Sequence, residues 1–290
     1  PSENLLSILR QEFIERGAEG DQELASTVRW SGDMNIGGRP ANFRVLRVKS
    51  RRLVMEGMAR VTLEGTDVEA LDRDGIHVKL MKPLHAVREP KWPILEANGS
   101  TTWPTGEDEL HARFVTLRHL RTDMREIDID IAIHNGGLIS DWASNPSIGD
   151  EVGIIGPGGD PELPVTDGVV LAADRTGLPA IARLLESVNG EATGLIVAEA
   201  ANIDELKSYL PDTTMRLAAF DRQSFHENVI REAREMSSLH TVNYAWFAGE
   251  FETAQAFRKH FKVDMGLTKH QQFSVAYWRR DVPGHTSREL

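Results

Sequence analysis

The stretch RFVTLR, residues 113–118, combines basic, hydroxyl and apolar side chains in an alternating pattern. In a β-strand Arg113 shares a face with Val115, and Thr116 lies on the opposite face. An arginine at a strand end can make paired, charge-assisted hydrogen bonds to a phosphate. We therefore take this stretch as a candidate anion site, with a solvated arginine on an edge strand as the alternative.

A glycine-rich segment, HNGGLISDWASNPSIGDEVGIIGPGG, occupies residues 134–159. It follows IDIDIAIH, residues 127–134, whose strict alternation predicts a half-buried strand. Glycine lets backbone N–H groups approach an anion closely, and Ser140, Asp141 and Ser144 suit a helix N-terminus. The segment is thus a second candidate anion site, and an ordinary surface loop is the alternative.

Further polar residues follow apolar runs in the second half of the chain. Asp174 and Thr176 come directly after VVLAA, and Gly249 and Glu250 end AWFAGE. If these runs are parallel strands, their carboxyl ends meet at one sheet edge, where nucleotides bind. Helix capping is the alternative for Asp174 and Thr176, and a strand–helix turn is the alternative for Gly249 and Glu250.

Composition excludes several classes of site. The 290 residues contain no cysteine and carry a net charge of −11. Disulfides, thiolate nucleophiles and cysteine-ligated metals are therefore excluded, and nucleic-acid binding is not expected. No long apolar run predicts a membrane span and no signal peptide is evident, so we expect a cytoplasmic protein.

The elements that must position these residues change character along the chain. A helix is predicted at residues 5–16, and residues 17–42 are polar and glycine-rich. Six short alternating runs follow between residues 43 and 160, and strand–helix alternation begins at Gly168. We predict an extension (1–42), an antiparallel β-barrel (43–162) and a parallel-sheet α/β domain (163–290).

These motifs, in this order, resemble the siderophore-interacting protein family of flavin-dependent ferric-siderophore reductases, within the ferredoxin–NADP reductase superfamily. Over residues 43–281 the similarity rests on a basic strand motif, the glycine-rich segment, the residues after VVLAA and the closing stretch. The matching residues are Lys79, Arg113, Val115, Thr116, Arg118, His134, Gly137, Ser140, Trp142, Ala143, Gly149, Asp150, Gly156, Pro157, Asp174, Thr176, Leu178, Pro179, Ala180, Ala248, Gly249, Glu250, Arg258, Tyr277, Trp278 and Arg279.

The sequence departs from the family pattern at three places. Val115 stands where the family usually has an aromatic residue against the flavin, and Arg175 replaces an acidic residue. Asn135 and Leu138 alter a loop that the family fills with glycine and proline.

The resemblance implies an FAD site. Arg113 would neutralise the pyrophosphate, with backbone N–H groups around Ser140–Ala143 completing that site, and Thr116 would face the reactive edge of the flavin. His134 would hydrogen-bond the cofactor, and Trp142 would pack on it or belong to the core.

The resemblance also implies a pyridine nucleotide, NADH or NADPH, at the α/β domain, near Asp174, Thr176, Gly249, Glu250 and Trp278. Reduced ferredoxin is the alternative donor. No side-chain acid or base and no resident metal is needed, because the protein contributes positioning.

The substrate would be an anionic ferric siderophore, reduced from Fe³⁺ to Fe²⁺. Lys79, Arg279 and Arg280 are candidate contacts, and solvated surface charges are the alternative. Two other functions remain open: a flavin-dependent reductase of quinones or free flavins, and a non-catalytic flavin- or siderophore-binding protein.

Overall fold

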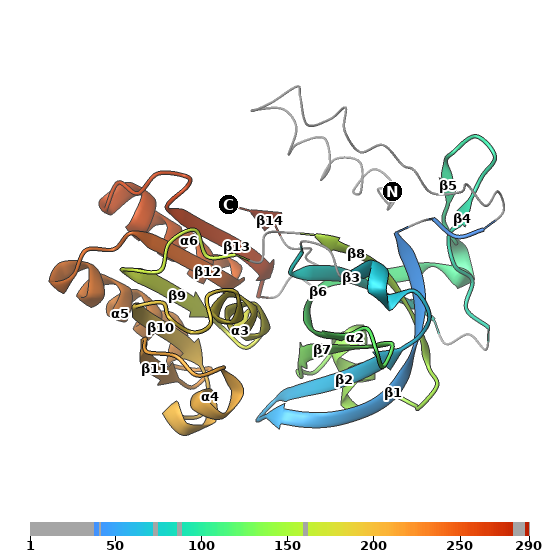
Figure 1. Ribbon diagram of the computed structural model, residues 1–290, viewed down its shortest axis with the longest axis horizontal. Coiled ribbons are helices and arrows are strands. Elements are labelled where there is room, and N and C mark those ends of the chain that lie inside the picture. Colours follow the sequence, from blue (N-terminus) through green and yellow to red (C-terminus); the bar gives the residue numbers. More distant parts are fainter. Residues whose placement is uncertain are drawn as a thin grey trace.

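The computed structural model describes residues 38–40, 42–71, 75–85, 89–158, 162–280 and the backbone of 288–289. The predicted helix at residues 5–16 lies outside the described residues. Two bodies, a β-barrel and an α/β domain, lie side by side (Figure 1).

Six antiparallel strands close the barrel in the order β1-β2-β7-β6-β3-β8. Apolar side chains alternate along each strand, so one face fills the interior, as in Ile127, Ile129 and Ile131. The predicted barrel is therefore confirmed. Its strands are β1 (Phe43–Met55), β2 (Met58–Glu64), β3 (His77–Pro83), β6 (Leu110–Arg121), β7 (Glu126–Ala132) and β8 (Glu151–Gly158).

Short elements cover the barrel. The stretch between β3 and β6 carries the two-residue strands β4 (Ile94–Leu95) and β5 (Thr101–Thr102) and the short helix η2 (Gly106–Asp108). Its Trp92 and Trp103 pack on the outer face, against Phe43 and Met81. A second short helix, η1 (Val68–Leu71), buries Val68 and Leu71 against the interior, and α2 (Leu138–Ser144) places Ile139 and Ala143 there as well.

The α/β domain has the sheet order β11-β10-β9-β12-β13-β14, parallel except for β14. Its strands are continuously apolar because helices cover both faces. The strands are β9 (Val169–Ala173), β10 (Gly194–Glu199), β11 (Arg216–Phe220), β12 (Tyr244–Glu250), β13 (Gln272–Trp278) and β14 (Arg288–Glu289).

Two helices pack on each face of the sheet. The core on one face joins alternate strand residues to α3 (Leu178–Ser187) and α4 (Ile203–Tyr209). The other core joins the remaining strand residues to α5 (Phe225–Leu239), α6 (Phe251–Arg258) and the π-helical turn η3 (Lys259–Asp264). Among the helices described, none is long and apolar enough to cross a membrane.

The barrel docks on the face of the sheet that carries α3 and α4 (Figure 1). Met55, Met58 and Ile76 of the barrel belong to the same apolar core as those helices. Arg118 Nη1 lies 2.7 Å from Glu186 Oε1, and Arg183 Nη1 donates to the Leu117 carbonyl at 2.6 Å. Apolar burial and directional polar contacts thus fix one domain against the other.

A buried carboxylate lies at the centre of this contact. Asp130 receives two hydrogen bonds from Arg60, each 2.7 Å long, and a third from Tyr209 of α4 at 2.7 Å. Burial, together with the Asp130 charge, raises the pKa of Tyr209 well above its usual value, so the hydroxyl keeps the proton that it donates.

Replacing Asp130, or its hydrogen-bond partner Tyr209, should destabilise the fold. Asp130→Asn leaves the buried Arg60 without its counter-charge, so the free energy of unfolding in urea should fall by about 3–5 kcal/mol. Tyr209→Phe removes one hydrogen bond to a charged group, a loss of about 1.5–3 kcal/mol. Asp108→Asn, which removes a solvent-exposed ion pair with Lys91, is the control. Equal effects of Asp130→Asn and Asp108→Asn would contradict this assignment.

Candidate functional site

Arg113 and Val115 project from β6 on its inward face. Their partners in the neighbouring strand β3 are Leu80 and Val78, which are buried in the barrel interior. Val115 packs partly against that core. Arg113 is half-buried and donates to the Ala112 carbonyl at 2.8 Å, and burial lowers its pKa. No described carboxylate lies within ion-pair distance of Arg113.

Two further basic residues share this face. Lys82 of β3 pairs directly with His111 of β6, two positions from the Leu80–Arg113 pair. Burial lowers the pKa of Lys82, and burial together with the Arg113 charge lowers the pKa of His111 to about 4. Lys82 and Arg113 thus supply positive charge at one end of the barrel in an acidic protein, a local site for an anion, and His111 beside them is neutral near pH 7.

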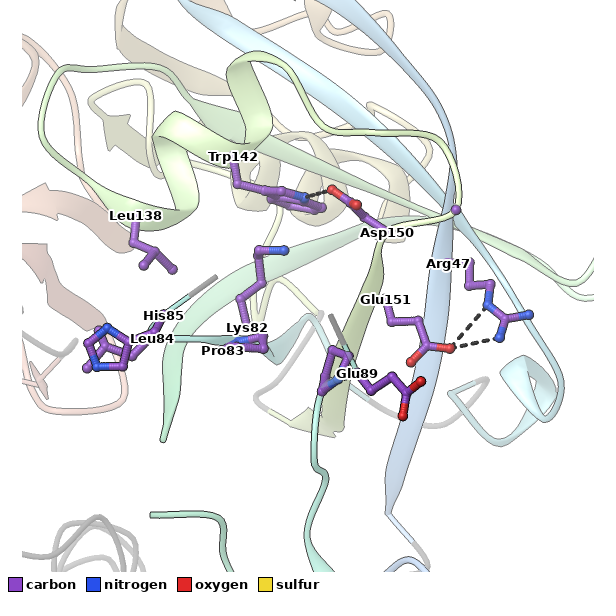
Figure 2. Close-up of a pocket in the computed structure, with 12 residues that line it drawn as sticks. Arg47, Lys82, Pro83, Leu84, His85, Glu89, Leu138, Trp142, Asp150 and Glu151 are labelled. Atoms are coloured by element: carbon purple, nitrogen blue, oxygen red, sulfur yellow. Dashed lines mark hydrogen bonds and ion pairs between the residues drawn. The ribbon is translucent and has the colours of Figure 1, made fainter. Parts of the chain in front are cut away.

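A cavity of about 650 Å³ opens beside Lys82 (Figure 2). The Lys82 side chain points between Trp142 and Asp150, and its Nζ lies 5.1 Å from the Trp142 ring centroid. Trp142 Nε1 donates to Asp150 at 3.2 Å, and Arg47 pairs with Glu151 at 2.8 Å. The cavity therefore has one aromatic wall and one lysine without an ion-pair partner among the residues described.

The glycine-rich segment forms a helix earlier than the sequence suggested. Helix α2 begins at Leu138, with Gly137 as its N-cap, and the Asp141 N–H already donates to the Gly137 carbonyl at 2.7 Å. The backbone donors at the helix start are therefore those of Leu138–Ser140. We expected these free N–H groups in the backbone around Ser140–Ala143, and the helix places them earlier in the chain.

Side chains in α2 hold the helix to the barrel. The Ser140 hydroxyl donates to the His134 carbonyl and accepts from the His134 N–H, both at 2.7 Å. The exposed His134 ring lies so close to Gly137 that a Cβ there would be 2.5 Å from the ring. Ala143 is fully buried in the barrel core, so a bulky residue there would disturb packing directly.

The opposite face of β6 carries Thr116, which is buried and pairs with His77 of β3. Lys79 lies on the same outer face, with its Nζ 4.6 Å from the Phe114 ring centroid. Lys79 and Lys82 therefore occupy opposite faces of β3.

Asp174 joins three strand ends of the α/β domain. One carboxylate oxygen accepts from the backbone N–H and hydroxyl of Thr176, at 2.8 and 2.5 Å. The other accepts from the Glu250 N–H and from Trp278 Nε1, both at 2.8 Å. Burial raises the pKa of Asp174. The ends of β9 and β12 thus meet as predicted, and Trp278 of β13 joins them at this carboxylate.

The neighbours of Asp174 have structural tasks of their own. Glu250 caps α6 by accepting from the N–H groups of Glu252 and Thr253, at 2.7 and 3.1 Å. It also accepts from the Arg280 N–H at 3.3 Å. The exposed Arg279 lies over the Phe251 ring, 4.6 Å from its centroid. Glu250 thus lies at the turn from β12 into α6, which is the alternative considered for it from the sequence.

The two halves of the chain match two family models. Residues 47–161 match a siderophore-interacting FAD-binding domain, and residues 166–281 match a siderophore-interacting protein domain. The chain belongs to the siderophore-interacting protein family. Its fold is that of the wider ferredoxin–NADP reductase superfamily.

Named relatives agree with this membership of the siderophore-interacting protein family. Ferric vibriobactin reductase ViuB of Vibrio cholerae is 28% identical over 82% of this chain and 89% of its own length. An NADPH-dependent ferric-chelate reductase of Escherichia coli is 24% identical over 81% and 92%. The crystal structure of the siderophore-interacting protein SipS from Aeromonas hydrophila shares the fold, with a TM-score of 0.69 and 24% identity over 83% and 93%.

At the Arg175 position, where the siderophore-interacting protein family usually has an acidic residue, a balancing charge is present. The Arg175 Nε lies 3.7 Å from the Glu199 carboxylate at the end of β10. The guanidinium reaches the β1–β2 turn, where a Cβ on Gly57 would be 2.6 Å from Nη1. Arg175 therefore bridges the two domains.

The predicted site residues form two groups in this member of the siderophore-interacting protein family. Arg113, Val115, His134, Ser140 and Trp142 lie around the barrel end, whereas Asp174 and its neighbours lie at the sheet edge. Sequence reasoning missed Lys82 and His111, because it singled out the other face of β3. The β3–β6 pairing, a contact between distant residues, is the signal that assigns them to the Arg113 face.

Replacing Gly249 should test the Asp174 cluster. A Cβ at position 249 would lie 2.5 Å from Asp174 Oδ2. Gly249→Ala should therefore lower the free energy of unfolding by about 1–3 kcal/mol. Gly158→Ala is the matched control, because its Cβ would meet only His77 Nε2, at 3.6 Å. If the two variants unfold alike in urea, the tight contact is refuted.

His111 should make stability fall in acid. Its pKa is about 4 in the fold, against 6.5 for an ordinary histidine, so its contribution is complete above pH 6.5 and is lost as the pH falls towards 4. His111→Gln should therefore lose less stability than the wild type when unfolding is measured from pH 7 down to pH 4. His240→Gln, at an exposed position, should follow the wild type. Parallel losses in wild type and His111→Gln would contradict the assignment.

Proposed function

We propose that this protein is an FAD-dependent ferric-siderophore reductase that takes its electrons from NADH or NADPH. One observation carries the proposal. The half-buried Arg113 and Lys82 at the barrel end form no ion pair with any carboxylate that the structure describes, and both lie in the segment that matches a siderophore-interacting FAD-binding domain. The ferric reductase names of two relatives support the reaction.

The barrel residues fit the charge of FAD. Arg113 would bind its diphosphate, since a half-buried guanidinium is better solvated by an anion than by the single carbonyl it now contacts. Backbone N–H groups at the start of α2 and the nearby His134 would complete that end. Val115 and Thr116 would flank the flavin ring. Bound FAD would exchange electrons between a two-electron donor and a one-electron acceptor.

The nucleotide would bind at the carboxyl ends of the parallel strands. The order β11-β10-β9-β12 puts the topological switch point between β9 and β12, where dinucleotides bind in such sheets. Asp174 and Gly249 end those two strands. Asp174, whose oxygens already accept four hydrogen bonds, would position the strand ends, with Thr176, Glu250 and Trp278 as its partners.

The overall reaction balances as one NAD(P)H and two Fe³⁺ giving NAD(P)⁺, a proton and two Fe²⁺. Oxygen donors hold Fe²⁺ less tightly than Fe³⁺, so reduction loosens the metal. The siderophore complex would meet basic side chains on the protein surface, for which Lys79, Arg279 and Arg280 are our candidates. No side-chain acid or base is required at the iron.

Val115 favours one alternative function, that of a non-catalytic protein that binds flavin without transferring electrons. It supplies no aromatic ring beside Arg113, so flavin binding without electron transfer would identify a non-catalytic binding protein. Reduction of quinones or free flavins in preference to ferric siderophores would identify a different acceptor.

Loss of the Arg113 charge should weaken FAD binding. Arg113→Gln removes charge-assisted hydrogen bonds, so the dissociation constant should rise about 10- to 100-fold in a flavin-fluorescence titration. Arg52→Gln, at an exposed position on β1, should bind like the wild type. Wild-type protein that binds no FAD would overturn the proposed function.

Electron transfer can be followed with the wild-type protein alone. NADH or NADPH should bleach the visible absorption of the bound flavin under anaerobic conditions, and a ferric siderophore should restore it. Reduced ferredoxin is a parallel arm that tests the alternative donor.

A further inference from the structure

Lys82 differs from the other lysines described in the barrel because its charge is held inside a cavity. It is half-buried, and its Nζ lies 5.1 Å from the Trp142 ring centroid (Figure 2). By contrast, Lys49 and Lys91 are exposed, and each pairs with a carboxylate. Asp150 attracts the Lys82 ammonium but makes no hydrogen bond with it among the described contacts, and an aromatic ring compensates its burial much less than a bound anion would.

The acidic groups around the cavity are already engaged or exposed. The Asp150 carboxylate accepts from Trp142 Nε1 and from the Ser147 N–H, at 3.2 and 3.1 Å. Glu151 pairs with Arg47 at 2.8 Å, and Glu89 is exposed. None of these carboxylates forms an ion pair with Lys82 among the described contacts. Asp150 attracts the Lys82 charge at longer range, but the ammonium can still donate its hydrogen bonds to a ligand.

Lys82 and Arg113 are diagonal neighbours on one face of the β3–β6 pair. Because Lys82 pairs with His111 and Arg113 with Leu80, the two backbone positions are about 7–8 Å apart. Both side chains are long, so their charged ends can converge on one group that carries two negative charges. A diphosphate is a group of that size and charge.

The walls of the cavity suit the rest of a nucleotide. Trp142, Leu138, Pro83 and Pro90 supply flat or apolar surface. The volume of about 650 Å³ lies within the range of small-molecule sites, which combine such walls with a few polar groups. A purine nucleoside attached to the diphosphate would find apolar contacts here.

We propose that Lys82 binds the diphosphate of FAD together with Arg113, and that the cavity beside it receives the adenosine half of the cofactor. This inference rests on the proposed function and adds to it the residue that distinguishes FAD from FMN. FMN carries the same flavin ring but lacks the second phosphate and the adenosine. Lys82 lines the cavity that would hold the adenosine, so it would contact the adenosine-side phosphate, which FMN lacks, and should matter for FAD alone.

The test compares binding of FAD and FMN to purified wild-type protein and to Lys82→Met, by fluorescence titration. Lys82→Met should raise the FAD dissociation constant about 10- to 100-fold and leave that of FMN unchanged. Lys82→Arg should retain FAD binding. Lys91→Met removes the same charge from the same domain at a position that is 72% exposed and should bind FAD like the wild type.

The outcomes separate the two proposals. If the wild type binds no flavin, the proposed function and this inference both fail. If the wild type binds FAD but Lys82→Met binds it equally well, or loses FMN to the same extent, this inference alone is overturned. Thermal unfolding checks that Lys82→Met is folded. If it is not, competition decides: ADP should displace FAD from the wild type, and failure to do so overturns the inference.

Discussion

The contact between the barrel and the α/β domain is the constraint on which the rest of the structure depends. The basic barrel end and the Asp174 cluster belong to different domains, so neither can serve the other unless the domains are held in a fixed relation. The buried Asp130 carboxylate, with Arg60 and Tyr209, provides one directional contact. Met55, Met58 and Ile76 provide the apolar area around it. The ion pair itself joins the barrel strands β2 and β7, and the Tyr209 hydrogen bond to the same carboxylate extends this contact to the α/β domain.

The two candidate sites use charge in opposite ways. At the barrel end, Lys82 and Arg113 are desolvated with little compensation, an arrangement that favours an anionic ligand. At the sheet edge, Asp174 is buried and fully compensated by donors from its own chain. The first arrangement is suited to binding, whereas the second fixes the positions of three strand ends.

Much of the fold could be predicted from sequence because its signals are local. Alternation in IDIDIAIH and continuous apolar runs such as VVLAA report burial on one or both faces. The six barrel strands and the strand–helix order followed from such patterns, although β14 did not. The site was harder, since strand pairing is not local. Lys82 lies beside Arg113 only because β3 pairs with β6. From the sequence, Lys79 was the lysine of this strand that we predicted to contact a ligand.

The position at which a helix begins within the glycine-rich segment could not be predicted from the sequence either. Ser140 and Asp141 looked like residues that precede a helix, but Gly137 takes the N-cap position and Ser140 binds back to His134. A hydroxyl that can cap a helix can equally tie it to a neighbouring strand, and only the three-dimensional arrangement decides between these uses.

The close contact between Gly249 and Asp174 also limits how this protein can evolve. A side chain at position 249 would occupy the space of the carboxylate oxygen that accepts from Glu250 and Trp278. Residue 249 can become larger only if residue 174 moves away, and the Glu250 N–H and the Trp278 indole N–H then need a new acceptor. The two positions, 75 residues apart in the sequence, are therefore bound to change together or not at all.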